Sequence, residues 1–219
     1  MKVIELKRTF TESNDRDAEE LRQYLKENKV FLINLMSAAG SGKTTLLSRL
    51  IADLQGKASI AVMEADIASA VDAERIAALG AQSIQVHTDG MCHMDAGMTR
   101  AGLEAMDLSG TGIIFLENIG NLICPAEYDT GAAKKVMILS VPEGDDKPLK
   151  YPLMFRESDA LVITKTDALP FFNFSMEKVC ERVKRLNPDI RIFPVSAKTG
   201  DGMAPLEEWL LEEAKAWQA

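Results

Sequence analysis

An apolar run at residues 31–36 leads directly into residues 37–45, which read Ser-Ala-Ala-Gly-Ser-Gly-Lys-Thr-Thr. A strand that breaks on glycines and restarts as a helix with a lysine and hydroxyls is the layout of a phosphate-binding loop. Backbone N–H groups and the helix N-terminus surround the phosphates, the lysine reaches the outer ones, and the next hydroxyl ligates Mg²⁺. The first glycine of the pattern G-x-x-x-x-G-K-[ST] is Ser37 here, which can still make the turn. We therefore predict a nucleoside triphosphate site whose phosphate-binding residues are Gly40, Ser41, Gly42, Lys43, Thr44 and Thr45.

Apolar runs suited to strands buried on both faces alternate with helical patterns along the chain. We expect the strands at residues 30–36, 58–63, 84–86, 112–116, 135–139, 159–163 and 190–195. We expect the helices at residues 43–54, 70–79, 95–106, 175–186 and 205–217. This alternation predicts an α/β fold with a mostly parallel sheet, helices on both faces, and ligands at the carboxyl ends of the strands.

The length of 219 residues suits one large α/β domain with a substantial core. Leu21, Tyr24 and Leu25 lie at helical spacing beneath a charged face. They predict an N-terminal helical extension at residues 1–29 that packs on the outside of the main domain, residues 30–219. The polar stretch at residues 142–152 is expected to be a long loop, functional or mobile.

The formal charge of −8 and the lack of a basic tract exclude nucleic acid as an expected partner. The N-terminus is too charged for a secretion signal, and no apolar run has membrane-spanning length, so we expect a cytoplasmic protein that binds no membrane. In a reducing cytosol the three cysteines are expected to be buried thiols or metal ligands.

Two short segments bear on which base is bound. Residues 164–167, Thr-Lys-Thr-Asp, follow one expected strand, and residues 196–198, Ser-Ala-Lys, follow the next. They resemble the N-K-x-D and S-A-K elements that read guanine in the GTPase superfamily. The resemblance implies that Asp167 accepts N–H donors from the guanine edge, that the Lys165 stem lies over the ring, and that the Ala197 N–H meets the guanine carbonyl. Ser196, in the same element as Ala197, is counted among the nucleotide-binding residues.

Thr164 stands where those GTPases have asparagine. Threonine keeps a hydroxyl but lacks the reach of an amide, so we expect guanine preference to weaken by about one hydrogen bond, roughly 1 kcal/mol. The alternative is that Thr164 and Thr166 are ordinary β-branched residues at the end of a strand.

A carboxylate and a glycine follow the strand expected at residues 112–116, within Glu117-Asn118-Ile119-Gly120. Glu117 can hold Mg²⁺ together with Thr44, and Gly120 can turn a backbone N–H toward a γ-phosphate. We predict Lys43, Glu117 and Gly120 to be catalytic. Asp66 and Asp72 are further candidates to reach the ion or the attacking water, although Asp72 is equally suited to cap a helix. No residue is an obvious general base, which suits slow hydrolysis.

Soft metal ligands occur in two of the segments that follow strands. Cys92 and His93 follow residues 84–86, and Cys124 lies four residues beyond Gly120. Two thiols and an imidazole at one sheet edge suit Ni²⁺ or Zn²⁺, with three ligands per chain or six across a two-fold dimer. Cys180 lies inside an amphipathic helical pattern and is expected to be a buried apolar residue.

Three longer segments, residues 85–96, 117–126 and 140–152, resemble the HypB family of hydrogenase nickel-insertion GTPases, and the resemblance runs from about residue 30 to the end. It implies a SIMIBI-type dimerising P-loop GTPase, with a metal site between protomers formed by Cys92, His93 and Cys124. It also implies a GTP-dependent homodimer, GTP or GDP with Mg²⁺, and Ni²⁺ or Zn²⁺ as bound metal. The implied partners are a nickel accessory protein of the HypA type and a hydrogenase large subunit.

Together these features favour a GTPase that delivers Ni²⁺ during maturation of a [NiFe]-hydrogenase. Because Cys124 shares a short segment with Glu117 and Gly120, hydrolysis could displace a metal ligand directly. A urease-type accessory GTPase is one alternative, but its Cys-Pro-His motif differs from adjacent Cys92 and His93. A small-molecule phosphotransferase, which needs an arginine-bearing lid, and a regulatory binder without hydrolysis are the others.

Overall fold

The structure is a computed structural model that describes residues 6–66, 76 and 78–219. Seven strands form a single sheet in the order β3-β2-β4-β1-β5-β6-β7, and each neighbouring pair is parallel. The strands are β1 Phe31–Ser37, β2 Ile60–Asp66, β3 Gln82–His87, β4 Ile113–Gly120, β5 Lys134–Ser140, β6 Ala160–Thr164 and β7 Arg191–Pro194. The predicted parallel α/β sheet is confirmed.

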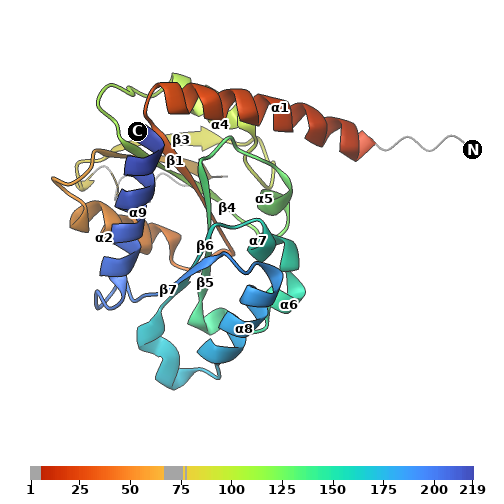
Figure 1. Cartoon of the computed structure of the whole chain (residues 1–219), viewed down its shortest axis with the longest axis vertical. Helices are drawn as coiled ribbons and strands as arrows, with labels where there is room; N and C mark the ends of the chain where they lie inside the picture. The colour runs from red at the N-terminus through yellow and green to blue at the C-terminus, as the bar shows by residue number, and fades with distance from the viewer. Residues whose placement is uncertain (1–5, 67–75, 77) are drawn as a thin grey trace, which may run out of the picture.

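Helices cover both faces of this sheet (Figure 1). The α-helices are α1 Leu6–Glu27, α2 Lys43–Asp53, α4 Ala96–Glu104, α5 Cys124–Glu127, α6 Lys147–Lys150, α7 Pro152–Arg156, α8 Met176–Leu186 and α9 Met203–Gln218, and the 3₁₀ helices are η1 Val141–Glu143 and η2 Thr166–Phe171. None of the described helices combines the length and apolar character that crossing a lipid bilayer requires.

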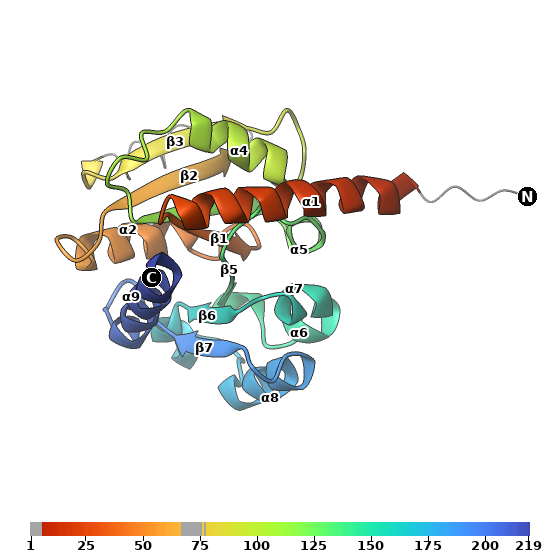
Figure 2. The ribbon, with the colours of Figure 1, turned by 45° about the horizontal axis from the view of Figure 1, so that its top comes forward.

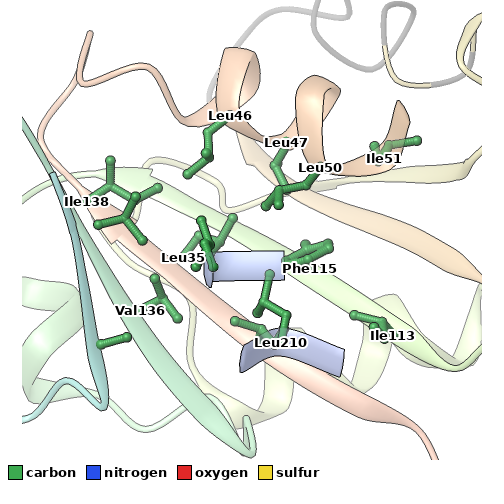
Figure 3. Close-up of a cluster of buried hydrophobic side chains, with 14 of the residues drawn as sticks. Leu35, Leu46, Leu47, Leu50, Ile51, Ile113, Phe115, Val136, Ile138 and Leu210 are labelled. Atoms are coloured by element: carbon green, nitrogen blue, oxygen red, sulfur yellow. The ribbon is translucent and has the colours of Figure 1, made fainter. Parts of the chain in front are cut away.

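Alternate residues of the central strands point into different buried clusters, as the pleat of a two-sided sheet demands. Phe31, Ile33 and Leu35 of β1 face α2 and α9, where Leu46, Leu47 and Leu50 pack (Figure 3). Leu32 of β1 faces the opposite side, where the cluster includes residues of α1 and α4. A third cluster lies between β5, β6, α7 and α8. The core therefore holds the carboxyl ends of the strands, and the loops that follow them, in fixed positions.

Two expectations about local structure need correction or a limit. Residues 142–152 do not form a long loop, because they fold into η1, α6 and the start of α7. Each of these short helices has a proline in its first turn, where the ring presets the backbone angle, and Asp145 accepts from Ser175 N at 3.0 Å and from Arg182 at 2.8 Å. The helix expected at residues 70–79 falls almost entirely outside the described residues.

Candidate nucleotide and metal site

A cleft of about 520 Å³ opens at the carboxyl ends of β1, β2 and β4. Its walls are formed by the phosphate loop, at residues 39, 40 and 42–45, and by residues that include Glu64, Glu117 and Lys165. This is the sheet edge where parallel α/β folds bind ligands, and its volume is within the range of small-molecule sites.

The loop between β1 and α2 has the backbone of a phosphate-binding loop. Gly40 and Gly42 adopt left-handed φ angles of 74° and 96°, and Gly42 caps α2 without a side-chain acceptor for the first N–H groups. Ser37 receives hydrogen bonds from Ser41 Oγ at 2.7 Å and from Lys43 Nζ at 2.9 Å. The serine that replaces the motif's first glycine therefore orients the lysine inside the loop.

Oxygen ligands suited to Mg²⁺ gather on one side of the loop. Thr44 Oγ1 donates to Glu117 Oε1 at 3.1 Å, so these two predicted ligands are in contact. Glu64 of β2 pairs in register with Glu117, is only 3% exposed, and also lines the cleft. Neighbouring carboxylates, here one buried and one half-buried, repel each other, and hard oxygen donors of this kind fit a Mg²⁺ ion that offsets their charge.

Sequence reasoning did not single out Glu64, although an acidic residue inside an apolar strand was an available signal. Asp66 ends β2 at the same sheet edge, but its side chain lies outside the described part of the chain. The candidate Asp72 lies outside the described residues altogether.

Gly120 brings the end of β4 against the phosphate loop. A Cβ atom on Gly120 would lie 2.8 Å from Ala39 N and 2.9 Å from Ala39 Cα. Glycine is therefore required for this contact between two backbones. The contact joins the phosphate loop to the strand that carries Glu117.

The two segments that resemble guanine-reading elements lie side by side. Ser196 Oγ donates to Asp167 Oδ1 at 2.8 Å and accepts from Thr199 N at 3.2 Å, which fixes the carboxylate of Asp167. Lys165 Nζ donates to Gly40 O at 2.8 Å, and Lys165 adopts a left-handed φ of 59°. Ala197, next to Ser196, packs at the margin of the main core cluster.

Thr164 makes a contact that the sequence did not predict. Its buried hydroxyl donates to Ser41 O at 2.7 Å, so it links the end of β6 to the phosphate loop. Thr164 thus supports the backbone of the phosphate loop and also directly precedes the segment of Lys165 and Asp167.

The three predicted ligands of a transition metal come together. One ligand atom each from Cys92, His93 and Cys124 can be chosen so that all lie within 4.8 Å of one another. Cys92 Sγ lies 2.8 Å from Cys124 Sγ and 3.8 Å from His93 Nδ1. His93 stacks on Tyr128, with ring centroids 3.7 Å apart and planes at 17°, and its buried Nε2 has no hydrogen-bond partner among the described residues.

Asparagine side chains hold the loops that carry these ligands. Asn121 Nδ2 donates to Cys92 O at 3.2 Å, and Asn121 Oδ1 accepts from Ile123 N at 2.9 Å. Asn118 Oδ1 accepts from Met94 N at 3.2 Å, next to His93. These supports were missed because isolated asparagines carry no spacing signal in the sequence.

The surroundings of Cys92 and His93 favour a protonated thiol and a neutral imidazole. The hydrogen bond with Cys124, followed by burial and by the charge of Cys124, raises the pKa of the Cys92 thiol. Burial lowers the pKa of His93, against the opposing charges of Asp95 and Glu127. A metal ion must therefore displace the proton of the Cys92 thiol, whereas it meets a neutral imidazole at His93. Two sulfur donors and one nitrogen donor suit Ni²⁺ or Zn²⁺, with room for further ligands.

The third cysteine has different surroundings. Cys180 lies in α8, half-buried against the cluster between β5, β6 and the helices, and burial raises the pKa of its thiol. Among the described residues, it is not part of the cluster of Cys92, His93 and Cys124.

The chain matches a known protein family and is similar in sequence to members of it. The family described as the CobW/HypB/UreG nucleotide-binding domain matches residues 31–194. Hydrogenase maturation factor HypB of Azotobacter chroococcum mcd 1 is 44% identical over 209 residues, which cover 95% of this chain and 68% of the relative.

Two solved structures are also similar. A crystal structure of HypB from Helicobacter pylori in complex with nickel has a TM-score of 0.88 and 36% identity, covering 94% of this chain and 98% of that chain. The signal recognition particle receptor FtsY of Elizabethkingia anophelis, at 13% identity, has a TM-score of 0.56 and covers 94% of this chain and 73% of that chain. This second likeness shows a shared fold alone.

Proposed function

We propose that this chain, which belongs to the HypB maturation factors within the CobW/HypB/UreG family, hydrolyses GTP and delivers Ni²⁺ during maturation of a [NiFe]-hydrogenase. The observation that carries the proposal is the continuity of β4. This strand bears Glu117 and Gly120 at the nucleotide cleft and leads within four residues to Cys124 at the metal site.

The nucleotide half of the proposal assigns a role to each group in the cleft. Lys43 and the N–H groups of residues 40–45 bind the phosphates, because the left-handed glycines and the start of α2 aim donors at one point. Thr44 and Glu117 hold Mg²⁺, which neutralises charge on the phosphates when bound. Asp167, oriented by Ser196, accepts from the guanine edge. Hydrolysis then depends on positioning and charge stabilisation rather than on a general base, and we expect it to be slow.

The metal half depends on the same strand. Gly120 abuts Ala39 of the phosphate loop, and Asn118 binds the loop of Cys92 and His93 through Met94 N. A change at the γ-phosphate that moves the end of β4 therefore reaches both segments that carry the cysteines, and it changes the separation between Cys124 and Cys92 when the two segments move by different amounts. Loss of one thiolate from the coordination shell would release the ion.

The exposed surroundings of the three metal-ligand candidates favour a dimer of this chain. Cys92 is exposed, and so are Met91 at 44% and Ile123 at 57% beside it. Three ligands leave positions open on a Ni²⁺ or Zn²⁺ ion, and a second copy of the chain can supply the remainder. We propose a cytoplasmic, GTP-dependent homodimer that receives nickel from a HypA-type accessory protein and passes it to a hydrogenase large subunit.

Titration of Ni²⁺ and Zn²⁺ with native mass measurement tests the metal assignment. Wild type is compared with Cys92→Ala and Cys124→Ala in GDP and in a non-hydrolysable GTP analogue, and Cys180→Ala is the matched control. We expect the first two variants to lose the ion and the control to bind like wild type. If metal binding is unchanged in both variants, the delivery role is refuted and only the nucleotide-binding role remains.

Single-turnover cleavage of GTP tests the enzyme assignment. Wild type is expected to release phosphate slowly, and Lys43→Ala to release none, because the lysine stabilises charge on the outer phosphates.

Competition between GTP and ATP tests the guanine assignment. ATP should compete weakly, because its base cannot supply the donors that Asp167 accepts. Equal competition by ATP and GTP would remove the guanine assignment.

A further inference from the structure

The N-terminal helix α1 lies against both segments that carry the transition-metal ligands. Figure 2 shows α1 running alongside α4, with α5 close to its N-terminal half. The buried residues Leu21 and Leu25 of α1 belong to the same cluster as Met94, which directly follows His93. The helix is therefore packed onto the metal-site loops as well as onto the sheet.

One side chain of α1 joins the two segments directly. Asn14 Nδ2 donates to Asp129 O at 2.9 Å, and Asn14 Oδ1 accepts from Ala96 N at 3.0 Å. Ala96 begins α4, three residues after His93. Asp129 follows Tyr128, the residue whose ring stacks on His93. A single amide thus cross-links the end of the Cys92–His93 loop to the segment that begins at Cys124.

Further contacts fix the second segment to the same helix. Arg22 donates to Asp129 Oδ2 at 2.7 Å and to Ala132 O at 3.2 Å. Gly131 lies so close to α1 that a Cβ on it would be 2.9 Å from Leu21 Cδ2. Because Arg22 and Leu21 hold residues 129–132, Asn14 ties the Cys92–His93 loop to a segment that is already anchored.

We propose that Asn14 is a positioning residue for the transition-metal site, through which α1 sets the separation between the Cys92–His93 pair and Cys124. The identity of the ion rests on the proposed function, whereas the positioning of the two thiols does not. On this proposal the N-terminal helix is part of the metal site and is more than an extension packed on the domain.

Asn14→Leu removes both hydrogen bonds at similar side-chain volume. The matched control is Asn28→Leu, because Asn28 follows the same helix and, among the described residues, its side chain donates to Tyr24 O of that helix at 2.8 Å and to neither metal-ligand segment. Two lost hydrogen bonds predict nickel binding weakened by about 5- to 30-fold in Asn14→Leu, measured by chelator competition in GDP. GDP affinity should stay within about twofold of wild type, since neither bond touches the nucleotide cleft.

A second measurement reports thiol separation without nickel. A monosubstituted arsenic(III) oxide condenses with two neighbouring thiols, forming two As–S bonds and releasing one water with no change of oxidation state. We expect Asn14→Leu to bind this reagent several-fold more weakly, whereas alkylation of Cys180, which lies outside the cluster, by iodoacetamide keeps its wild-type rate. Asn14→Ala replaces the leucine variant if that variant unfolds at a lower temperature than Asn28→Leu.

The two measurements separate this proposal from the function on which it rests. Wild-type affinity of the Asn14 variants for the arsenic reagent would overturn the positioning role, whether or not nickel binding changed. If wild type binds no nickel but the Asn14 variants lose affinity for the arsenic reagent, the positioning role stands and the nickel assignment fails.

Discussion

Replacing Gly120 by alanine tests whether the end of β4 and the phosphate loop move as one unit. The added Cβ would lie 2.8 Å from Ala39 N and 2.9 Å from Ala39 Cα, both backbone atoms. Neither atom can rotate away as a flexible side chain can. The clash therefore has to be relieved by moving the loop, the strand or both.

The size of the effect follows from that clash. Ordinary contact needs a separation of about 3.5 Å, so the two backbones must part by roughly 0.6 Å. Overpacking of this kind costs about 1–3 kcal/mol. If the phosphate loop absorbs the whole shift, GTP and GDP affinity should fall by about 5- to 150-fold. If β4 absorbs it, nickel affinity should fall instead, because Cys124 follows the strand.

Gly112→Ala is the matched control, because Gly112 lies immediately before the other end of β4. A Cβ on Gly112 would meet Gln218 Nε2 at 3.5 Å and Ser59 O at 3.6 Å, which are ordinary contacts. Fluorescent GDP binding, nickel competition and the unfolding midpoint are measured for both variants. If Gly120→Ala matched the control in all three, the argument that these backbones are rigidly coupled would be refuted.

Three further predictions concern the ionisation of Cys92, the hydrogen bond from Thr164 to the phosphate loop, and the carboxylate of Glu64. Because the pKa of the Cys92 thiol is raised and the thiolate is the ligand, nickel affinity should rise steadily with pH up to at least about pH 9, and a flat calorimetric profile would contradict the assignment. Thr164→Val loses the bond to Ser41 O, so GTP and GDP affinity should fall together by about 5-fold with an unchanged GTP-to-ATP ratio. Glu64→Gln should raise the Mg²⁺ concentration needed for GTP binding, and an unaltered Mg²⁺ requirement would exclude Glu64 from the ion's surroundings.

Features encoded by neighbouring residues were predictable from the sequence. The parallel sheet follows from apolar runs that alternate with helical patterns, and the phosphate loop follows from Gly40, Gly42 and Lys43 after a buried strand. The meeting of Cys92, His93 and Cys124 also follows, because parallel strands end at the same edge of the sheet.

Contacts between distant segments were not predictable. Asn14 bonds to residues 82 and 115 positions away, and Thr164 bonds to a carbonyl 123 positions away. No spacing rule applies to a single polar side chain at such separations. The stretch at residues 142–152 was misjudged for another reason, since its polarity reflects exposure while its prolines start short helices.

Strand β4 contributes to both the nucleotide cleft and the supports of the Cys92, His93 and Cys124 cluster. Glu117 lines the cleft beside the phosphate loop, and the side chain of the next residue, Asn118, is buried and accepts from Met94 N, which follows His93. If the end of β4 is the shared two-state element, linkage requires equal effects in both directions. The factor by which a non-hydrolysable GTP analogue changes nickel affinity, relative to GDP, must equal the factor by which nickel changes the preference for that analogue over GDP. Unequal factors, measured by calorimetry in one buffer, would mean that the two sites do not share a single equilibrium.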